Sequence, residues 1–490
     1  MNLAATIRAT PAMACRPWSR HVVSPERWAA LAEEAGLALL ALWGEAQAVH
    51  ALWRDAAGML AVSLPVAEGR YPALSPRRPG AILFERAIAD LWGHAATDAV
   101  DARPWLDHGR WQVTAPLSPR PPARPGGAEP VDFAAAEGLD QIAIGPLAGG
   151  IAEAGQFRLY IHGGVVARAE VRLGYLHKGV EALMRGKSPR AASRFAARLA
   201  GEAAVAHGIA FARAAEAACD VAPPPRALAL RAVMAEAERI ASHLADLAAL
   251  ARAGGVVLAA GPCERHREAM LRAAAQGFGH RLMMDVVVPG GLATDLAPQG
   301  GEALRSAVAS LAGDLPGLAR LCAGLARRLA GVAVTPPDTV SALAPGGPAG
   351  RAAGRDGDLR RAPGYRPYHD LNVPPPHETG GDAAARLAVL LAELRDSARM
   401  LRTLLAELPG GETVAALPQA AGEGFGWAEG PRGDIWTWLR LEGGQIAGAF
   451  LRDPGWLHLP LLAAAAAGSD LADWPVLRAS FGLSQSGMDL

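Results

Sequence analysis

Four polar side chains share one face of a segment that is otherwise apolar. Glu236, Arg239, His243 and Asp246 follow one another at intervals of three, four and three residues, which places side chains on one side of an α-helix. Most of the surrounding residues are alanine, leucine or valine. A histidine among charged neighbours can handle protons near neutral pH. We call these four residues the polar stripe. The polar stripe predicts a proton-handling or interface role, with an internal ion-pair ladder or a solvated face as the alternative.

A second titratable pair lies upstream, in the segment RLGYLHKGVEALMRG (172–186). His177 and Glu181 are four residues apart, a spacing that brings side chains together on a helix, although it is common by chance. No glycine-rich nucleotide loop, HExxH zinc motif or GxSxG nucleophile motif stands in a fitting context. The sequence therefore gives no direct support for NAD or ATP binding within this chain.

Composition narrows the classes of function. The 490 residues include 48 Lys+Arg and 48 Asp+Glu, so no net field attracts nucleic acid, and nucleic-acid binding is not expected. The 4 cysteines form no C-x-x-C pair, which argues against a disulfide framework or a metal knuckle and favours a reducing, cytoplasmic compartment. No run of roughly 18 uncharged apolar residues occurs. Direct membrane insertion is therefore not expected, and any membrane association should come through partner subunits.

The elements that position these residues are predicted to form two domains of an α+β fold. Short apolar segments within 1–117 are typical of a small α+β domain. Residues 118–130 are rich in proline and glycine, which sustain neither helix nor strand, and are predicted to be a linker. The remaining residues, 131–490, are predicted to be mainly helical with peripheral β-structure.

Start and stop signals predict the individual elements. Ser188 and Pro189 form a cap followed by a first-turn proline, which predicts a helix that runs to about Cys219. Further helices are predicted at 226–253, 262–276, 301–331 with an interruption near Pro316, and 382–408. Strands are predicted at 141–148 and on both sides of a Gly163–Gly164 turn within 156–171. The final segment, 414–490, contains the two further strand candidates DIWTWLRL and QIAGAFL. The Pro/Gly-rich stretch 334–381 is predicted to be a long loop, and such loops are usually functional, partner-bound or disordered.

The order of seven motifs resembles one protein family. The chain contains, in sequence, IGPLAGGIAEAGQFRLYI, RLGYLHKGVEALMRG, RLAGEAAVAHGIAFARAAE, MAEAERIASHLADL, GHRLMMDVVVPGG, GDAAARLAVLLAELRDSARML and EGPRGDIWTWLRL. This order is similar to that in the large subunit of membrane-bound (group 4) nickel–iron hydrogenases and in the homologous quinone-site subunit of respiratory complex I. Residues 71–93 and the following DARPWLDHGRW resemble the small complex I subunit that is fused to the large subunit in formate hydrogenlyase and hydrogenase-4. The resemblance implies a complex I small-subunit-like domain over 1–117 and a hydrogenase-large-subunit-like domain over 131–490.

The resemblance also implies where a metal would bind. In the hydrogenases, four thiolates from two C-x-x-C pairs hold nickel and iron. The first pair falls on Ala200 and Ala203, and the better match for the second places Ser484 and Gly487 at the cysteine positions, with the segment at Asp453 as a weaker match. Alanine and glycine carry no ligand atom, and serine is a poor ligand. No metal is therefore expected in this chain.

The complex I subunit implies a different ligand. There, a histidine in the first hairpin loop and a tyrosine aligned with the first cysteine pair hydrogen-bond a quinone. The matching positions here are Ala154 and Gly201, so both donors are absent. Gln156 or His207 could substitute, because each side chain has a donor. A quinone could therefore bind, but no cofactor is predicted from this chain alone.

The family resemblance places an active-site cavity near the two implied ligand pairs, and the residues around it are the candidates for a catalytic or cofactor-binding site. Titratable and charged side chains that could take part in catalysis are Glu181, Arg198, His207, Arg239 and His243, and the residues expected to line the cavity are Ala154, Gln156, Ala200, Gly201, Ala203, Ser484 and Gly487. The segment that contains Glu429 and Arg432 also resembles the family. The alternative for each residue is that it only maintains the packing of a shared helical bundle.

Three hypotheses about function follow from the resemblance. The first is a subunit of a membrane-associated respiratory oxidoreductase complex that lacks its own nickel–iron centre and couples electron transfer to ion translocation. It would dock on a small iron–sulfur subunit that holds the cluster, connect to antiporter-like membrane subunits on the cytoplasmic face of the inner membrane, and leave NAD(H) to another subunit. The second is a non-catalytic structural or coupling subunit, and the third, disfavoured by its missing ligands, is an active nickel–iron hydrogenase. An open polar pocket around Ala200, Ala203 and Ser484 would favour catalysis, and a filled one a structural role.

Overall fold

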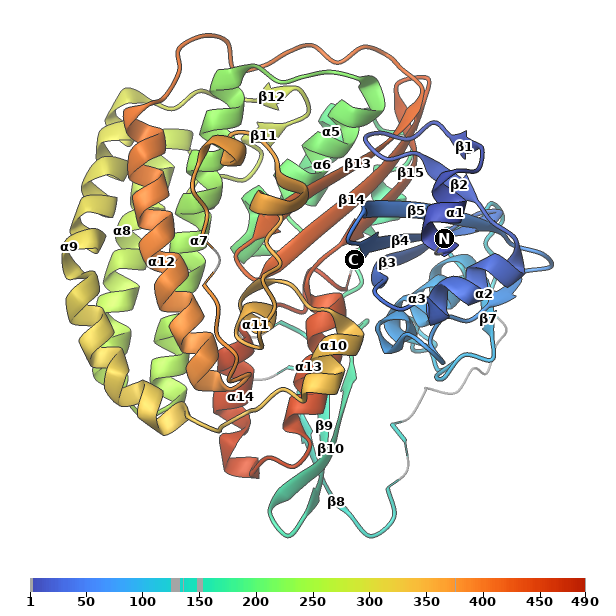
Figure 1. Cartoon of the computed structure of the whole chain (residues 1–490), viewed down its shortest axis with the longest axis horizontal. Coiled ribbons are helices and arrows are strands. Elements are labelled where there is room, and N and C mark those ends of the chain that lie inside the picture. Colours follow the sequence, from blue (N-terminus) through green and yellow to red (C-terminus); the bar gives the residue numbers. More distant parts are fainter. Residues whose placement is uncertain (1–2, 125–132, 135, 148–152, 375, 490) are drawn as a thin grey trace.

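A bundle of long helices lies beside a set of β-sheets in the computed structural model, which describes residues 3–124, 133–134, 136–147, 153–374 and 376–489 (Figure 1). The long helices are α7 (Pro225–Ala253), α8 (Ala260–Phe278), α9 (Pro298–Leu329) and α12 (Ala383–Ala406). Within the bundle, α8 contacts α7 and α9, and α12 contacts the same two helices. This combination of a bundle and sheets confirms the predicted α+β class.

The N-terminal residues form a five-stranded sheet in the order β1-β2-β5-β4-β3. Its strands are β1 (Ala12–Met13), β2 (Arg20–Val22), β3 (Ala38–Glu45), β4 (Ala48–Asp55) and β5 (Gly58–Pro65), and around them lie α1 (Leu3–Arg8), α2 (Pro25–Glu33), β6 (Arg70–Pro72), α3 (Ile82–Trp92) and β7 (Ala95–Thr97). The middle residues of β3, β4 and β5 are buried without alternation, because both faces of the sheet are covered. Trp43 of β3 stacks on Phe450 at 5.0 Å and so joins this sheet to the C-terminal one.

The C-terminal sheet is an antiparallel meander of β13 (Gly422–Gly430), β14 (Gly433–Glu442) and β15 (Gln445–Arg452). Helix α6 (Ala204–Cys219) lies along β13 (Figure 1). Gly422, Gly424 and Gly426 alternate on β13, and a side chain at any of them would overlap a backbone carbonyl of α6. The glycines and the alanines of α6 therefore let helix and strand approach closely.

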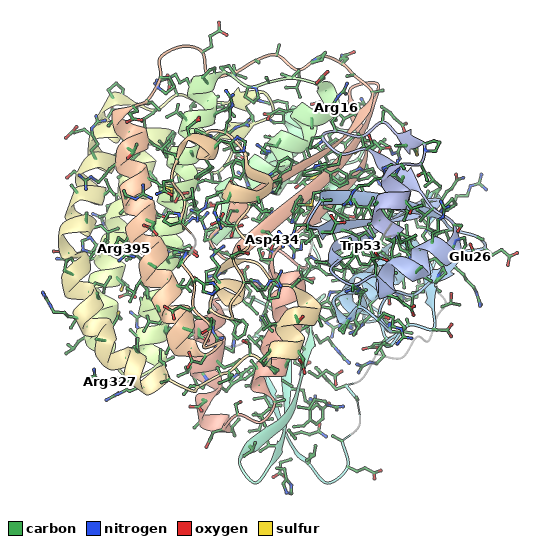
Figure 2. The ribbon with its side chains drawn as sticks, viewed as in Figure 1. Arg16, Glu26, Trp53, Arg327, Arg395 and Asp434 are labelled. Carbon is green, nitrogen blue, oxygen red and sulfur yellow. The ribbon has the colours of Figure 1, made fainter. Side chains whose placement is uncertain are left out.

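The remaining elements surround these layers. A three-stranded sheet of β8 (Asp140–Ile144), β9 (Gln156–His162) and β10 (Val165–Arg172) contains the predicted hairpin, whose turn residues Gly163 and Gly164 both have positive φ. The short elements are α4 (Val180–Met184), α5 (Pro189–Ala196), β11 (Val287–Val288), β12 (Gly291–Leu292), α10 (Pro337–Leu343), α11 (Gly347–Arg351), α13 (Gly455–Ala466) and α14 (Trp474–Phe481). Figure 2 shows Arg327 and Arg395 projecting from the outer faces of the bundle, whereas Trp53 lies inside the N-terminal part. No helix in the described ranges is both long and apolar enough to cross a bilayer.

The helix predicted from Ser188 to Cys219 is not continuous. Ser188 caps α5 as predicted, but the chain leaves the helix after Ala196, passes through an extended Ala200 and a 3-10 turn over Gly201–Ala203, and then enters α6. Partners from other segments replace the lost helical hydrogen bonds: Lys178 donates to the Leu199 carbonyl, and Glu238 accepts from the first amides of α6. Ala200 and Ala203, the positions at which the family resemblance implies the first pair of metal ligands, therefore lie in the connection between α5 and α6 and not within a helix.

Two further predictions are wrong for physical reasons. Helix α9 continues through Pro316, because its contacts with α8 and α12 hold the helix on both sides of the one amide that proline lacks. The stretch 334–381 is not an open loop: it forms α10, α11 and two short helical turns, and it buries Arg351, Arg360 and Tyr368. The predicted linker 118–130 lies within the described residues only up to 124, so the domain boundary there stays a prediction.

Candidate functional site

The position implied for the metal is filled by side chains. Ala203 and Ser484 both border this position, together with Glu202, Arg432, Asp453 and His458, and the space left among them is only about 10 Å³. A cavity needs a volume of roughly 10–15 Å³ to hold a single water molecule. The loop before α6 and the C-terminal residues therefore meet at a packed junction.

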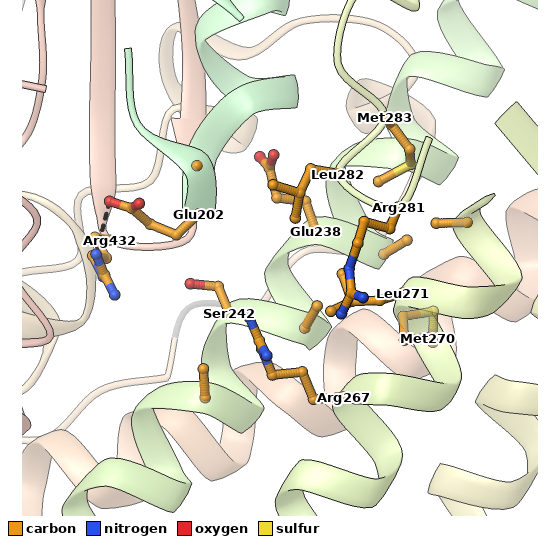
Figure 3. Close-up of a pocket in the computed structure, with 15 residues that line it drawn as sticks. Glu202, Glu238, Ser242, Arg267, Met270, Leu271, Arg281, Leu282, Met283 and Arg432 are labelled. Atoms are coloured by element: carbon orange, nitrogen blue, oxygen red, sulfur yellow. Dashed lines mark hydrogen bonds and ion pairs between the residues drawn. The ribbon is translucent and has the colours of Figure 1, made fainter. Parts of the chain in front are cut away.

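Ion pairs occupy this junction. The Arg432 guanidinium lies 2.8 Å from Glu202 and 3.0 Å from Asp246, and Figure 3 shows the first of these contacts. Burial alone would lower the pKa of Arg432, but the carboxylates of Asp246 and Glu202 raise it above its usual value. Burial raises the pKa of Glu202, and Arg432 opposes that rise. The junction thus holds a permanent cation between two acids.

His207 is part of the same junction. Its side chain is fully buried, and Nε2 lies 3.0 Å from Oδ2 of Asp453. Burial would raise the pKa of Asp453, but the hydrogen bond from His207 holds it below its usual value. Nδ1 of His207 has no hydrogen-bond partner among the described residues. His207 therefore fixes Asp453 and does not face an open cavity.

The residues at the junction do not fit a nickel–iron centre. A side chain at Gly487 would overlap the Asp453 carboxylate, and one at Gly455 would lie 2.7 Å from the sulfur of Met488. Ala200 is almost completely buried. Within the described ranges, no three or more His, Cys, Asp or Glu side chains have a metal-binding arrangement. Neither the donor set nor the space therefore suits the group that the family resemblance implies.

Hydrogen bonds join the two segments that thiolates would otherwise link through the metal. The Lys178 ammonium donates to the Leu199 carbonyl at 2.8 Å and to the carbonyl and hydroxyl oxygens of Ser486 at 2.6 and 2.9 Å. Glu153 accepts hydrogen bonds from the Ser484 hydroxyl at 2.8 Å and from the Ser486 amide at 3.0 Å. Lys178 therefore fastens the C-terminal residues to the loop before α6, and Glu153 fastens them to the segment before β9.

The Lys178→Met variant tests this fastening. We expect it to lower the free energy of unfolding by about 2 kcal/mol, because a partly buried ammonium group loses three acceptors, and to speed proteolysis of the C-terminal residues after Phe481. Thermal unfolding and limited proteolysis with mass spectrometry measure the two effects. Lys187→Met is the matched control, because no side-chain hydrogen bond or ion pair joins Lys187 to another described residue. Equal proteolysis rates in the two variants would contradict the fastening role.

An open cavity begins next to the filled junction. It has a volume of about 330 Å³ and lies between α7, α8 and the segment 281–283 (Figure 3). Polar side chains come from Glu202, Glu238, Ser242, Arg267, Arg281 and Arg432, and apolar ones from Met270, Leu271, Leu282 and Met283, with alanines of α7 and α8. A side chain at Gly201 would meet only Leu282, at 3.8 Å, so this glycine leaves the cavity open. We call this space the Gly201 cavity.

Two of its polar groups are uncharged donors. Ser242 is 5% exposed, and its hydroxyl has no hydrogen-bond partner among the described residues. Burial raises the pKa of Glu238 to about 8, although the Val205 and Ala206 amides donate to its carboxyl group and oppose the rise. The cavity therefore offers a hydroxyl and, at neutral pH, a carboxylic acid beside its apolar wall.

The polar stripe of α7 is buried, so the solvated-face alternative is wrong. His243 lies 2.8 Å from Glu393 of α12, and Arg239 donates to the carbonyl oxygens of Glu429 and Gly430 at 2.6 and 2.9 Å. Glu236 accepts a 2.6 Å hydrogen bond from the Tyr368 hydroxyl. The stripe forms internal ion pairs, mainly with other segments rather than along its own helix.

Arg351 joins these contacts into one buried network. Its guanidinium lies 2.7 Å from Glu393, 2.9 Å from Glu429 and 3.7 Å from Asp358, and Asp358 in turn lies 2.7 Å from Arg360. Burial and the nearby Asp358 raise the pKa of Glu429 to about 7, against the effect of Arg351. Sequence reasoning missed Arg351, Asp358 and Arg360 because it interpreted their segment as a loop. Charged residues in a stretch otherwise rich in Gly, Ala and Pro were the available signal.

The other predicted site residues are dispersed. His177 and Glu181, both described, form no ion pair or hydrogen bond with each other. Arg198 is half-exposed and pairs with Asp285 at 2.6 Å on the surface. Ala154 is buried, and Gln156 accepts a hydrogen bond from the Tyr175 hydroxyl at 2.6 Å. Of the predicted lining residues, only Gly201 borders the open cavity.

Comparisons with known proteins give consistent matches. Residues 259–423 match the model of the respiratory-chain NADH dehydrogenase 49 Kd subunit, and residues 178–251 match that of nickel-dependent hydrogenase. A NADH-quinone oxidoreductase subunit of Dehalococcoides mccartyi is 30% identical over 336 residues, which cover 67% of this chain and 91% of the relative. Formate hydrogenlyase subunit 5 of Escherichia coli is 28% identical over 386 residues, which cover 75% and 68%.

A solved structure supports the fold. A chain of the membrane-bound sulfane sulfur reductase, an archaeal respiratory membrane complex, matches with a TM-score of 0.67 and 23% identity, over 72% of this chain and 98% of that one. At this identity the match concerns the arrangement of helices and strands alone.

Proposed function

Because the chain belongs to the family of the NADH-quinone oxidoreductase subunit named above, we propose that it is a subunit of a membrane-bound respiratory oxidoreductase complex. It would lie on the cytoplasmic face of the inner membrane, dock on a small iron–sulfur subunit and connect to antiporter-like membrane subunits. Electron transfer in the complex would drive ion translocation, with NAD(H), where it takes part, bound by another subunit. This chain would contribute no nickel–iron centre of its own.

The difference in volume between the filled junction and the Gly201 cavity indicates where an electron acceptor could bind. The space at the implied metal position is about 10 Å³, whereas the neighbouring Gly201 cavity has about 330 Å³. The Dehalococcoides mccartyi relative is named as a subunit of an NADH-quinone oxidoreductase. We therefore place a quinone-type electron acceptor in the Gly201 cavity and not at the junction.

The residues of the cavity fit such an acceptor. The Ser242 hydroxyl and the Glu238 carboxylic acid would each donate a hydrogen bond to a carbonyl oxygen, and the wall formed by Met270, Leu271, Leu282 and Met283 would contact the ring. A bound quinone would supply a two-electron, two-proton acceptor. Neither Gln156 nor His207 lines this cavity, so the predicted replacement donors are superseded by Ser242 and Glu238 in the proposal.

The Gly201→Trp variant tests the proposal. Gly201 faces open space, so the indole should enter the cavity without displacing the backbone. In the purified complex, we expect the rate of quinone reduction to fall by at least tenfold, because the ring loses its binding volume. Gly261→Trp is the matched control: Gly261 is exposed, has no neighbour within 4 Å of an added side chain and should leave the rate unchanged. Equal rates for both variants would contradict the acceptor site.

The filled junction also supports a second candidate, a non-catalytic coupling subunit. In that case Gly201→Trp would leave quinone reduction intact, whereas variants of the Arg351 network would uncouple it from ion movement. Stoichiometric nickel in the purified complex, or hydrogen uptake by it, would contradict both candidates.

A further inference from the structure

A second cavity shares no lining residue with the Gly201 cavity. It has a volume of about 270 Å³ and lies between Leu91 and the segment 111–117 on one side and residues 177–182, at the start of α4, on the other. Arg185 donates to the Leu117 carbonyl at 2.8 Å and holds these two parts of the chain together. Ligands bind preferentially in clefts between separately packed segments. We call this space the Trp111 cavity.

Most of its wall is apolar and suits a ring. Leu91, Val113, Pro116 and Leu117 supply aliphatic surface. The Trp111 indole lies against the His177 ring, with 4.7 Å between their centroids and 34° between their planes. A dry cavity of roughly 150 Å³ holds one benzene. The Trp111 cavity therefore has room for a compound of two fused rings.

Glu181 lines the Trp111 cavity and is a buried carboxyl group without a salt-bridge partner among the described residues. The side chain is 7% exposed, and Oε1 has no hydrogen-bond partner among the described residues, whereas the Leu451 amide donates to the carboxyl group. No described cation forms a salt bridge with it. Burial raises the pKa of Glu181 to about 8, although Arg185 opposes the rise. At neutral pH the carboxyl group therefore holds its proton and has an O–H to donate.

The two neighbouring cations are already engaged. The Lys178 ammonium makes three hydrogen bonds, to Leu199 and to Ser486. Arg185 donates to Leu117, and its guanidinium lies 4.6 Å from the centroid of the Trp92 ring. Neither side chain is thus free to bind an anionic ligand in the cavity.

His177 adds a second uncharged group. Its Nδ1 atom is buried and has no hydrogen-bond partner among the described residues. Burial lowers the pKa of His177 to about 4, so the imidazole is neutral at physiological pH. The cavity therefore presents a neutral acid and a neutral imidazole to whatever enters it.

We propose that the Trp111 cavity is a binding site for a small uncharged ring compound with one hydroxyl or carbonyl oxygen, in the class of aryl alcohols and aryl ketones. The ring would lie against Trp111 and the aliphatic wall, and the oxygen would accept the hydrogen bond from Glu181. A carboxylate ligand would lose its hydration without gaining a counter-ion, so the cavity selects against carboxylates. The site is separate from the acceptor site proposed above.

Titration calorimetry on the full-length chain tests this, with 2-naphthol and 2-naphthoate as probes that share one ring system and differ in charge. We expect 2-naphthol to bind at one site at least tenfold more tightly than 2-naphthoate. Val113→Trp should abolish binding by filling the cavity, and Ala182→Trp, at an exposed position of the lining, should do the same if the first variant folds poorly. Leu176→Trp is the control, because Leu176 is exposed and outside the lining.

Two further variants locate the polar contact. Glu181→Leu keeps the volume and removes the donor, so it should weaken 2-naphthol about fivefold, the value of one hydrogen bond, and leave naphthalene unaffected. Gly201→Trp should leave 2-naphthol binding unchanged, which separates this site from the acceptor site. The proposal is wrong if 2-naphthol shows no saturable binding, if the cavity-filling variants bind it as the wild type does, or if 2-naphthoate binds more tightly.

Discussion

Replacing Arg351 with methionine should lower the free energy of unfolding by about 3–5 kcal/mol, the usual cost of removing one partner from a buried ion pair. Arg351 is fully buried and lies within 3.7 Å of Glu393, Glu429 and Asp358. Without its guanidinium, these three carboxyl groups would face one another in a region that water does not reach. Denaturant unfolding at neutral pH, with the midpoint and slope compared between variants, measures the loss.

The matched control is Arg361→Met in the same segment. Arg361 is exposed and donates one 3.3 Å hydrogen bond to the Asp356 carbonyl, so its loss should cost no more than about 0.5 kcal/mol. Adding Glu393→Gln to Arg351→Met should recover part of the stability, because one of the stranded negative charges is removed. Similar midpoints for Arg351→Met and Arg361→Met would show that the network contributes little to stability.

The network also shows where sequence reasoning reached its limit. The stripe on α7 follows from helical spacing alone, and the structure confirms that Glu236, Arg239 and His243 share a face. Their partners lie far along the chain: 150 residues separate His243 from Glu393, and 132 separate Glu236 from Tyr368. Local patterns carry no information about such pairings. Burial of the stripe was therefore outside what its spacing could predict.

Tertiary contacts overrode local signals in two elements. Strand β13 was missed because its glycines disfavour strands, yet those glycines are what allow α6 to lie against it. The break before α6 was missed because no proline marks it. The hydrogen bonds that stabilise the break come from Lys178 and Glu238, neither of which lies in the segment itself.

The residues at the implied metal site show a similar limit. Ala203 and Ser484, which the family resemblance assigns to the two ligand pairs, border the same small space, but Ala203 lies in a turn where the sequence predicts a helix. Sequence reasoning treated the segments at Asp453 and Ser484 as competing matches, whereas both line the same junction. What fills the junction, Arg432 between Glu202 and Asp246, depends on side-chain packing that residue spacing does not specify.

Buried acids should make stability depend on pH, and Glu238 provides the clearest test. The pKa of Glu238 in the folded protein is raised to about 8, mainly by burial. An unfolded glutamate titrates near 4.3, so between these values the folded state binds one more proton than the unfolded state. This group's contribution is complete below the unfolded pKa and is lost as the pH rises through the folded pKa. The loss amounts to about 1.4 kcal/mol per pH unit.

Glu238→Gln isolates this contribution, because glutamine does not titrate. The Val205 and Ala206 amides donate to different oxygens of Glu238, and the single carbonyl oxygen of glutamine can accept from only one of them, so the variant also carries a loss of stability that does not depend on pH. Between about pH 5.5 and 7.5, the stability difference between wild type and variant should fall by about 3 kcal/mol. Other buried acids, such as Glu181 and Glu429, titrate in both proteins and cancel from the difference. Glu412→Gln, at an exposed position, should follow the wild-type curve. A constant difference across this range would mean that Glu238 is already ionised in the folded protein, and the Gly201 cavity would then lose the carboxylic acid donor on which its proposed acceptor site depends.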